Sequence, residues 1–408
     1  MTPVLVVGGG IGGLTAALSL HAAGIDAVVV ESARRIQPLG VGMNLLTHGV
    51  RELTELGLGA DLAALGVATA EHVFCDGSGN RLFTEPRGLA QGYRWPQYSI
   101  HRGELQLMLL ERVRERLGPD AVRTGVRLLD FTEGPDAVRV RVTDRATGAV
   151  ETFEAAALIG ADGLHSTVRA RLHPDEGPLC WSGQRMWRGV TEGFPPFLTG
   201  RSVVIAGDGT ASLVAYPIGR DRVNWVCLVR VAEPGPLPED GVVNTVDDHR
   251  AGRLKDVLSH YDGWSMGWLD VRELLERSDR VLEYPMVDRD PLPAWGRGRV
   301  TLLGDAAHPM YPAGANGASQ AVLDARVLAH ELARADGDTP AGLAAYERAR
   351  LDATAAVVLA GRAMERAGGI GALDRSQLAL ITEMYRQKAE SDVAELNARP
   401  SLTPPGRP

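Results

Sequence analysis

Cysteine is scarce in this chain of 408 residues, and its pattern points to no cysteine chemistry. Cys75, Cys180 and Cys227 lie far apart in the sequence and form no C-x-x-C pair. That spacing argues against a disulfide framework, a redox-active dithiol and a cysteine zinc site. We therefore expect the cysteines to be small buried hydrophobic residues, and we predict no metal site.

The chain also lacks any block or stripe of lysine and arginine. Acidic residues outnumber basic ones by 51 to 43, and the formal net charge is −8. Such a surface repels phosphate, so we do not expect nucleic acid as a partner. Residues 2–25 carry no charge, but the glycines at 8–13 are unsuited to a membrane span or a signal sequence, and no basic segment precedes them. We therefore expect a cytoplasmic protein without a membrane partner.

One segment near the N-terminus indicates the class of cofactor. A β-branched run ends in Gly8-x-Gly10-x-x-Gly13, an apolar helical pattern follows, and a second β-branched run closes on Glu31. This strand–turn–helix–strand unit is typical of dinucleotide binding. Gly8 permits a tight turn, Gly10 lets the backbone approach a pyrophosphate, and Gly13 lets the helix pack on the strand. Glu31 is then placed to accept hydrogen bonds from the hydroxyls of an adenosine ribose.

The rest of the chain alternates between helical and strand patterns. Periodicity predicts helices over residues 50–64, 102–117, 317–334, 340–367 and 374–397, and strands over 138–142, 153–159, 202–206, 212–218, 222–231 and 300–303. We predict an α/β protein in which a discontinuous Rossmann-like domain carries an inserted, mostly antiparallel β domain and C-terminal helices. The expected boundaries are 1–70, 98–176 and 283–366 for the cofactor domain, 71–97 and 177–282 for the substrate domain, 367–398 for a C-terminal helix and 399–408 for a disordered tail.

Two aspartates extend the predicted cofactor site. Asp162 and Asp305 each follow a predicted strand directly, as Gly8 and Glu31 do. Ligands of open α/β sheets lie beyond the carboxyl ends of the strands. Four distant parts of the chain are therefore expected to converge on one elongated ligand.

Three motifs together resemble the signatures of the class A flavoprotein monooxygenases. They are GGGIGG at residues 8–13, GADGLHSTVR at 160–169 and GDAAHP at 304–309. Within this family, MWRGVT at 186–191, VAYPI at 214–218 and GANGASQ at 314–320 are most similar to the phenazine-carboxylate hydroxylases of the pyocyanin pathway. A second G-x-G-x-x-G unit and the W-x-W-x-I-P segment of flavin-dependent halogenases are both missing from the sequence.

The resemblance implies an FAD enzyme that is reduced by NADH or NADPH and hydroxylates an aromatic or heteroaromatic ring through a flavin C4a-hydroperoxide. Its partners would be dioxygen and a small aromatic substrate, either a phenazine carboxylate or a salicylate-like acid, with or without decarboxylation. A monomer or homodimer is expected. The alternatives are another flavin oxidoreductase of the same fold, such as a reductase or halogenase, and a non-enzymatic nucleotide-binding protein.

The resemblance also assigns cofactor contacts. Arg102 would contact the FAD pyrophosphate, Asp305 a ribityl hydroxyl, and Asp162 both FAD and the nicotinamide nucleotide. The alternatives are a solvated arginine at a helix start, a helix N-cap and a turn aspartate, respectively. The expected cofactor-binding set is Gly8, Gly10, Ile11, Gly12, Gly13, Glu31, Gly42, Arg102, Asp162, Gly163, Asp305, Pro312, Gly314, Asn316 and Gly317.

No catalytic side chain follows with certainty from the sequence. His308 and Pro312 are candidates: His308 has a structural role as its alternative, while Pro312 stiffens a loop whose backbone amides point at an anionic flavin. Arg188, Tyr216 and Trp225 are candidate substrate contacts. Arg188 would pair with a substrate carboxylate, and the two aromatic residues would line the pocket unless they belong to the hydrophobic core.

Overall fold

A parallel sheet of five strands organises one part of the computed structural model, which describes residues 2–38, 40–238, 253–366 and 392–402. The strand order is β19-β12-β1-β2-β8. Val7 pairs with both Val30 and Gly160, and Gly160 pairs with Leu302, so four of these strands end at the same edge. The strands are β1 (Val4–Val7), β2 (Ala27–Glu31), β8 (Val122–Thr124), β12 (Ala157–Gly160) and β19 (Val300–Leu302).

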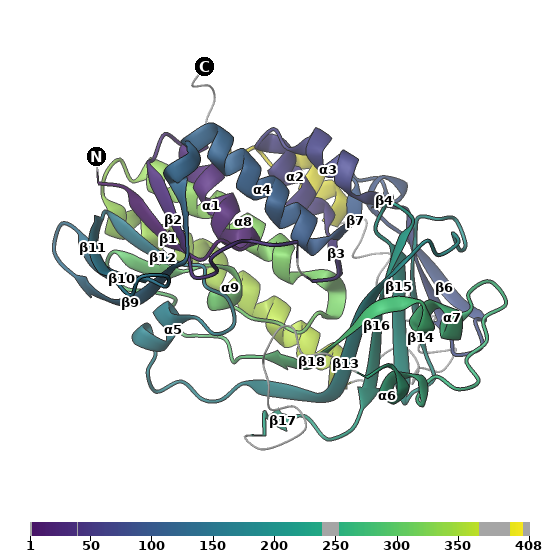
Figure 1. Ribbon diagram of the computed structural model, residues 1–408. Helices are drawn as coiled ribbons and strands as arrows, with labels where there is room; N and C mark the ends of the chain where they lie inside the picture. The colour runs from purple at the N-terminus through teal and green to yellow at the C-terminus, as the bar shows by residue number, and fades with distance from the viewer. Residues whose placement is uncertain (1, 39, 239–252, 367–391, 403–408) are drawn as a thin grey trace.

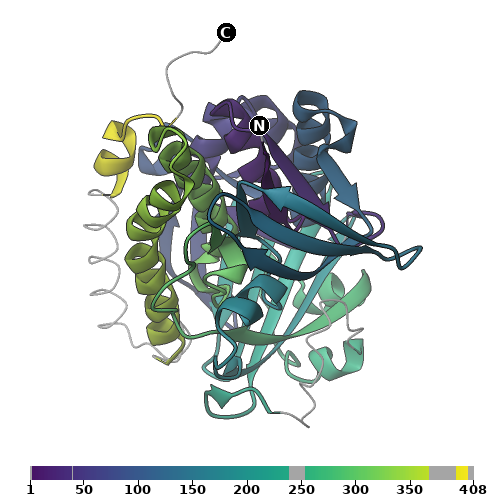
Figure 2. The ribbon, with the colours of Figure 1, turned by 90° about the vertical axis from the view of Figure 1, so that its left-hand side faces the viewer.

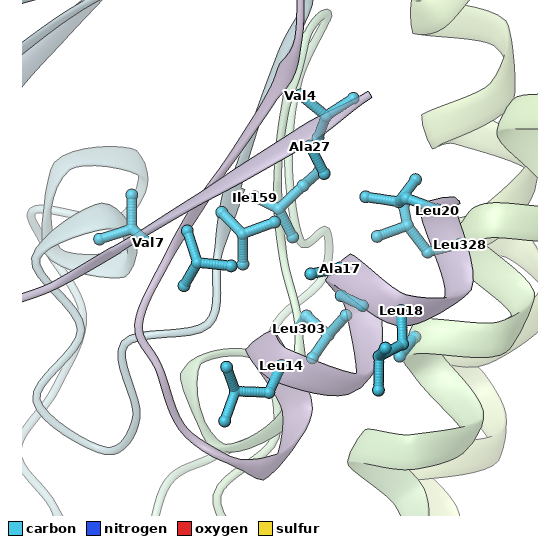
Figure 3. Close-up of a cluster of buried hydrophobic side chains, with 14 of the residues drawn as sticks. Val4, Val7, Leu14, Ala17, Leu18, Leu20, Ala27, Ile159, Leu303 and Leu328 are labelled. Atoms are coloured by element: carbon cyan, nitrogen blue, oxygen red, sulfur yellow. The ribbon is translucent and has the colours of Figure 1, made fainter. Parts of the chain in front are cut away.

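Helices cover one side of this sheet, and a small antiparallel sheet lies on its other side (Figure 1). Figure 3 shows how α1 buries Leu14, Ala17 and Leu18 between the strands and the neighbouring helix α8. The small sheet has the order β11-β10-β9. The elements are α1 (Ile11–Ala22), α4 (Arg102–Leu117), α8 (Gly317–Arg334), α9 (Thr339–Arg366), β9 (Val126–Glu133), β10 (Val138–Asp144) and β11 (Val150–Ala155).

An eight-stranded sheet, here called the large sheet, forms the other end of the molecule (Figure 1). Its order is β17-β13-β16-β15-β14-β5-β6, and β18 also pairs with β13. Every pair is antiparallel except β5 with β14. The strands are β5 (Glu71–Asp76), β6 (Arg81–Pro86), β13 (Cys180–Glu192), β14 (Ser202–Gly207), β15 (Ala211–Pro217), β16 (Arg222–Arg230), β17 (Gly235–Pro236) and β18 (Ser278–Asp288).

A further sheet, of order β3-β7-β4, is antiparallel. It joins two strands that precede β5 and β6 in the sequence to one that follows them. Figure 2, seen from the side, shows α9 running along the molecule beside the sheets. The remaining elements are β3 (Gly42–Leu45), β4 (Val67–Thr69), β7 (Gln97–His101), α2 (Thr47–Glu55), α3 (Gly59–Leu65), α5 (Thr167–Leu172), α6 (Leu254–Leu258), α7 (Val271–Glu276) and the short 3-10 turns η1 (Gly88–Gln91), η2 (Pro119–Ala121), η3 (Gly304–Ala306) and η4 (Ala313–Ala315).

The predicted fold class is confirmed, with two local corrections. The single helix predicted over 50–64 is two helices, because Gly57 adopts a φ of +80° and ends α2 with hydrogen bonds from Gly57 N–H to the Thr54 carbonyl and from Leu58 N–H to the Leu53 carbonyl. The strand predicted over 153–159 is two strands of different sheets, which separate at Ala156.

The predicted helices over 102–117 and 317–334 match α4 and α8, and α9 lies within one residue of its prediction. Most of the helix predicted over 374–397, and the end of the predicted tail, lie outside the described residues. No helix among the described residues combines the length and the apolar character needed to cross a bilayer.

Candidate functional site

The glycine turn after β1 has the geometry that dinucleotide binding requires. Gly8 has a φ of +114°, and a Cβ there would lie 2.2 Å from the Ala161 carbonyl oxygen. A Cβ on Gly13 would lie 2.0 Å from the Gly8 carbonyl oxygen, so α1 packs directly on the turn. A Cβ on Gly10, by contrast, would meet no described atom within 4 Å. The turn therefore leaves open space at the N-terminus of α1, where helix amides attract a pyrophosphate.

Glu31 closes this site from the end of β2. Its half-buried carboxylate accepts hydrogen bonds from Gly9 N–H at 2.7 Å and from Ala33 N–H at 2.6 Å. Oε1 also accepts a hydrogen bond from the Ser32 hydroxyl at 3.2 Å, whereas Oε2 keeps its second lone pair. Glu31 is thus oriented by its neighbours, and Oε2 retains acceptor capacity for a ribose hydroxyl.

We predict that Glu31→Ala weakens FAD binding by about 2 kcal/mol, or roughly thirtyfold, because charge-assisted hydrogen bonds are lost. The FAD dissociation constant of each variant, measured by flavin fluorescence after reconstitution, tests this. Asp26→Ala is the matched control, since Asp26 is an exposed acid just before the other end of β2. Equal FAD affinity in wild type and Glu31→Ala would show that another residue holds the ribose.

Asp162 lies at the end of β12 and organises its own loop. Its carboxylate accepts hydrogen bonds from the Ser166 hydroxyl at 2.5 Å and from Thr167 N–H at 2.7 Å, at the start of α5. Burial raises the pKa of Asp162, although these hydrogen bonds act to lower it. Gly163 follows with a φ of +76°, as a turn at this point requires. Asp162 is therefore a turn aspartate at the sheet edge, and its contact with a cofactor stays a prediction.

The GDAAHP motif places Asp305 at the same sheet edge. Asp305 is exposed in η3, and one of its carboxylate oxygens lies 3.8 Å from the position of a Cβ on Gly317. The loop between them is tightly turned, since Gly314 has a φ of +73° and Ala315 one of +56°. Asn316 then caps α8, and exposed Pro312 precedes η4. The Asp305 carboxylate therefore lies next to the N-terminus of α8.

Gly42 and Arg102 lie close together, where β7 leads into α4. Gly42 pairs with His101 across β3 and β7, and Arg102, which begins α4, is exposed. A Cβ on Gly40 would lie 3.9 Å from the Arg102 Cδ atom. The predicted pyrophosphate contact is thus next to the glycine loop 40–42 and open to an incoming anion.

Two of the three predicted substrate contacts meet on one face of the large sheet, here called the inner face. Arg188 on β13 donates from Nη2 to the Gly42 carbonyl oxygen at 2.9 Å, and its guanidinium stacks 6.0 Å above the Tyr284 ring. Tyr216 on β15 is buried beside it. Burial raises the pKa of Tyr216 to about 12, although Arg188 acts to lower it, and burial lowers the pKa of Arg188. The inner face therefore presents a cation and a neutral phenol to β3.

Trp225 does not join them. Its fully buried side chain belongs to a separate hydrophobic cluster with Trp187 and Leu274, on the opposite, outer face of the large sheet. A Cβ on Gly189 would lie 2.3 Å from the Trp225 ring, which fills the space above that glycine. The structure thus places Trp225 at a core position, because successive residues of a strand point to opposite faces.

Asn224, the neighbour of Trp225, is a residue of the inner face that the sequence analysis missed. Its side chain is fully buried, and Oδ1 accepts a hydrogen bond from Gly42 N–H at 2.7 Å. The available signal was an amide as the second residue of the otherwise apolar run from Val223 to Val229. Tyr284 was missed as well, because β18 lies outside the regions where strands were predicted.

His308 lies inside the protein rather than at this face. It is 3% exposed, and its Nε2 lies 2.6 Å from Asp324 Oδ2, while Arg350 Nε donates to Asp324 Oδ1 at 2.7 Å. Asp324 Oδ2 also accepts from Gly304 N–H at 3.1 Å. The cluster ties α8 and α9 to η3, the turn that carries Asp305.

We predict that Asp324→Asn costs about 2 kcal/mol of stability at neutral pH. Burial alone would raise the pKa of Asp324, but His308 and Arg350 outweigh it and lower the pKa from 3.8 to about 2. The ionised carboxylate therefore stabilises the folded state above pH 3.8, and this contribution is lost as the pH falls toward 2. Urea unfolding at neutral pH and at acidic pH measures it. Asp352→Asn, an exposed position on α9, should change stability by under about 0.5 kcal/mol. If the loss of stability in Asp324→Asn is as large at acidic pH as at neutral pH, this account is contradicted.

Comparison with known proteins identifies the family. The model of the FAD binding domain family matches residues 1–178 and 277–360. Phenazine 1,6-dicarboxylic acid hydroxylase PhzS from Lysobacter antibioticus is 51% identical over 400 residues, which cover 94% of this chain and 96% of that protein. 3-Hydroxybenzoate 6-hydroxylase 1 from Aquipseudomonas alcaligenes is 34% identical, with 87% and 86% covered. HpxO from Klebsiella pneumoniae, solved with FAD and uric acid, matches with a TM-score of 0.77 at 26% identity, covering 97% of this chain and 96% of that one.

These matches confirm the resemblance to class A flavoprotein monooxygenases and the prediction of FAD as cofactor. The geometry fits that cofactor independently, because the open glycine turn, the oriented Glu31 carboxylate and the exposed Asp305 all lie along one sheet edge. The chain therefore belongs to the FAD binding domain family and is an FAD-dependent, NAD(P)H-using monooxygenase of aromatic rings.

Proposed function

We propose that the aromatic substrate is a phenazine carboxylate, bound on the inner face of the large sheet beside the contact of that face with β3. The observation that supports this is the Arg188 guanidinium, which lies beside Tyr216 and stacks above Tyr284. A cation with aromatic neighbours suits a planar acid, whose carboxylate pairs with the arginine while its rings pack on the aromatic side chains. The 51% identical relative is itself named for a phenazine acid.

The remaining contacts are proposed to hold the cofactor. Glu31 would bind the adenosine ribose, Arg102 and the α1 N-terminus the pyrophosphate, and Asp305 a ribityl hydroxyl. The amides at the start of α8 would face the flavin ring, whose reduction and reaction with dioxygen supply the oxygenating chemistry. His308 is proposed to be structural, because it supports η3 from inside the protein.

A substrate panel tests the proposal. The purified FAD enzyme is supplied with NADH or NADPH and, separately, with phenazine-1-carboxylate, phenazine-1,6-dicarboxylate, salicylate and 3-hydroxybenzoate. We expect the phenazine acids to stimulate NAD(P)H oxidation and to yield products heavier by one oxygen, or products in which a hydroxyl replaces the carboxyl group. Hydroxylation of the benzoates alone would overturn the proposed substrate class.

A further inference from the structure

The Asn224 side chain carries a hydrogen-bond donor for which the described residues offer no acceptor. Asn224 lies on β16, pairs with Val190 and Tyr216 on the adjacent strands, and is fully buried. Its Oδ1 must face Gly42, because the Gly42 N–H is the donor of their 2.7 Å hydrogen bond. Nδ2 therefore points away from Gly42, and it has no hydrogen-bond partner among the described residues.

Arg188 shows the same pattern at the carbonyl group of Gly42. Its Nη2 donates to the Gly42 carbonyl oxygen at 2.9 Å, while its buried Nε has no hydrogen-bond partner within the described part of the chain. Asn224 and Arg188 thus bind the N–H and the carbonyl oxygen of Gly42, respectively. Each of the two side chains keeps one donor without a partner among the described residues. Buried donors are seldom left unpaired, because the loss of water is then uncompensated.

Two unused donors close to one glycine suit a ligand with two neighbouring acceptors. We propose that Asn224 Nδ2 binds the ring nitrogen of the substrate while Arg188 binds the carboxylate next to it, an inference that rests on the proposed function. In phenazine-1-carboxylate the carboxylate and the nearest ring nitrogen lie side by side on the same edge, with their lone pairs facing the same way. Two donors on one side relieve the repulsion between these lone pairs.

This arrangement makes Asn224 a determinant of substrate specificity. A carbocyclic acid of the same shape presents a C–H group where phenazine has its nitrogen, so Asn224 Nδ2 would remain unpaired. A site with a buried donor discriminates against an analogue that lacks the acceptor. The enzyme should therefore prefer nitrogen heterocycles to carbocyclic acids of equal size.

The test compares two isosteric ligands, phenazine-1-carboxylate and anthracene-1-carboxylate, which differ in the two ring positions between the outer rings. Their dissociation constants are measured by perturbation of the flavin absorbance in the FAD enzyme, without turnover. We expect wild type to bind the phenazine acid roughly tenfold more tightly. In Asn224→Ala and Asn224→Asp, both of which lack the amide donor, the preference should fall below about twofold.

The ratio of the two affinities separates a specific role from general damage, because a distorted site weakens both ligands alike. If wild type binds both acids equally well, the Asn224 assignment is overturned while the proposal of a planar tricyclic acid stands. A preference that survives in both variants also overturns the assignment. If neither acid binds, the proposed function itself fails. Should one variant lose FAD, the other variant and the wild-type ratio still decide.

Discussion

Gly13→Ala is expected to cost about 3 kcal/mol of stability or more, enough to deplete the folded protein. The added Cβ would lie 2.0 Å from the Gly8 carbonyl oxygen. Backbone lies on both sides of this contact, so no side-chain rotation relieves it, and α1 must move away from β1. The loss exceeds the gain of about 1 kcal/mol that alanine brings to a helix. Urea unfolding of the FAD-free protein measures the effect.

Gly10→Ala is the matched control, and it should show the opposite pattern. Gly10 caps α1 with a φ of −75°, which alanine adopts without strain, and no described atom lies within 4 Å of its added Cβ. We expect the stability of the FAD-free protein to change by under about 0.5 kcal/mol, while FAD affinity falls at least about tenfold, because the methyl group occupies the approach of the pyrophosphate. Normal FAD affinity in Gly10→Ala would place the pyrophosphate elsewhere.

These two glycines illustrate what the sequence alone predicts well. A glycine motif between a strand and a helix has few structural solutions, so the tight turn at Gly8 and the close packing at Gly13 follow from their spacing, while the approach of a pyrophosphate to Gly10 stays a prediction. The convergence of Glu31 and Asp305 follows from topology, because parallel strands place their carboxyl ends at one edge. Such inferences depend on local chemistry and on rules of chain connection, both of which are visible in a sequence.

The direction in which side chains of the large sheet point was harder to predict from the sequence. Trp225 and Asn224 are neighbours, and the aromatic residue was the natural candidate, yet it points to the outer face and the amide to the inner face. Alternation requires that they differ, but it does not say which face meets the cofactor domain. That choice depends on how β3 packs against β16, a contact between segments 182 residues apart.

Arg188→Met is expected to weaken the binding of a phenazine carboxylate about hundredfold, which corresponds to about 2.7 kcal/mol. Methionine keeps much of the length of the side chain but cannot pair with a carboxylate. Unsubstituted phenazine, which carries no carboxylate, should bind both forms with similar affinity. The dissociation constants are obtained by flavin absorbance titration, and FAD content is checked in each variant, because Arg188 also contacts the Gly42 carbonyl oxygen.

Arg185→Met provides the control on the same strand. Arg185 pairs with Glu283 at 2.7 Å and stacks 4.7 Å above the Trp187 ring, so it is tied to side chains other than those of the inner face. Its replacement removes one positive charge from β13 and should leave the affinity for the acid within about twofold, since a partly exposed pair contributes little. If both variants lose affinity equally, the effect is one of overall charge or stability. A loss confined to Arg188→Met and to the acid would instead place the substrate carboxylate at the Arg188 guanidinium, next to β3 and the glycine loop.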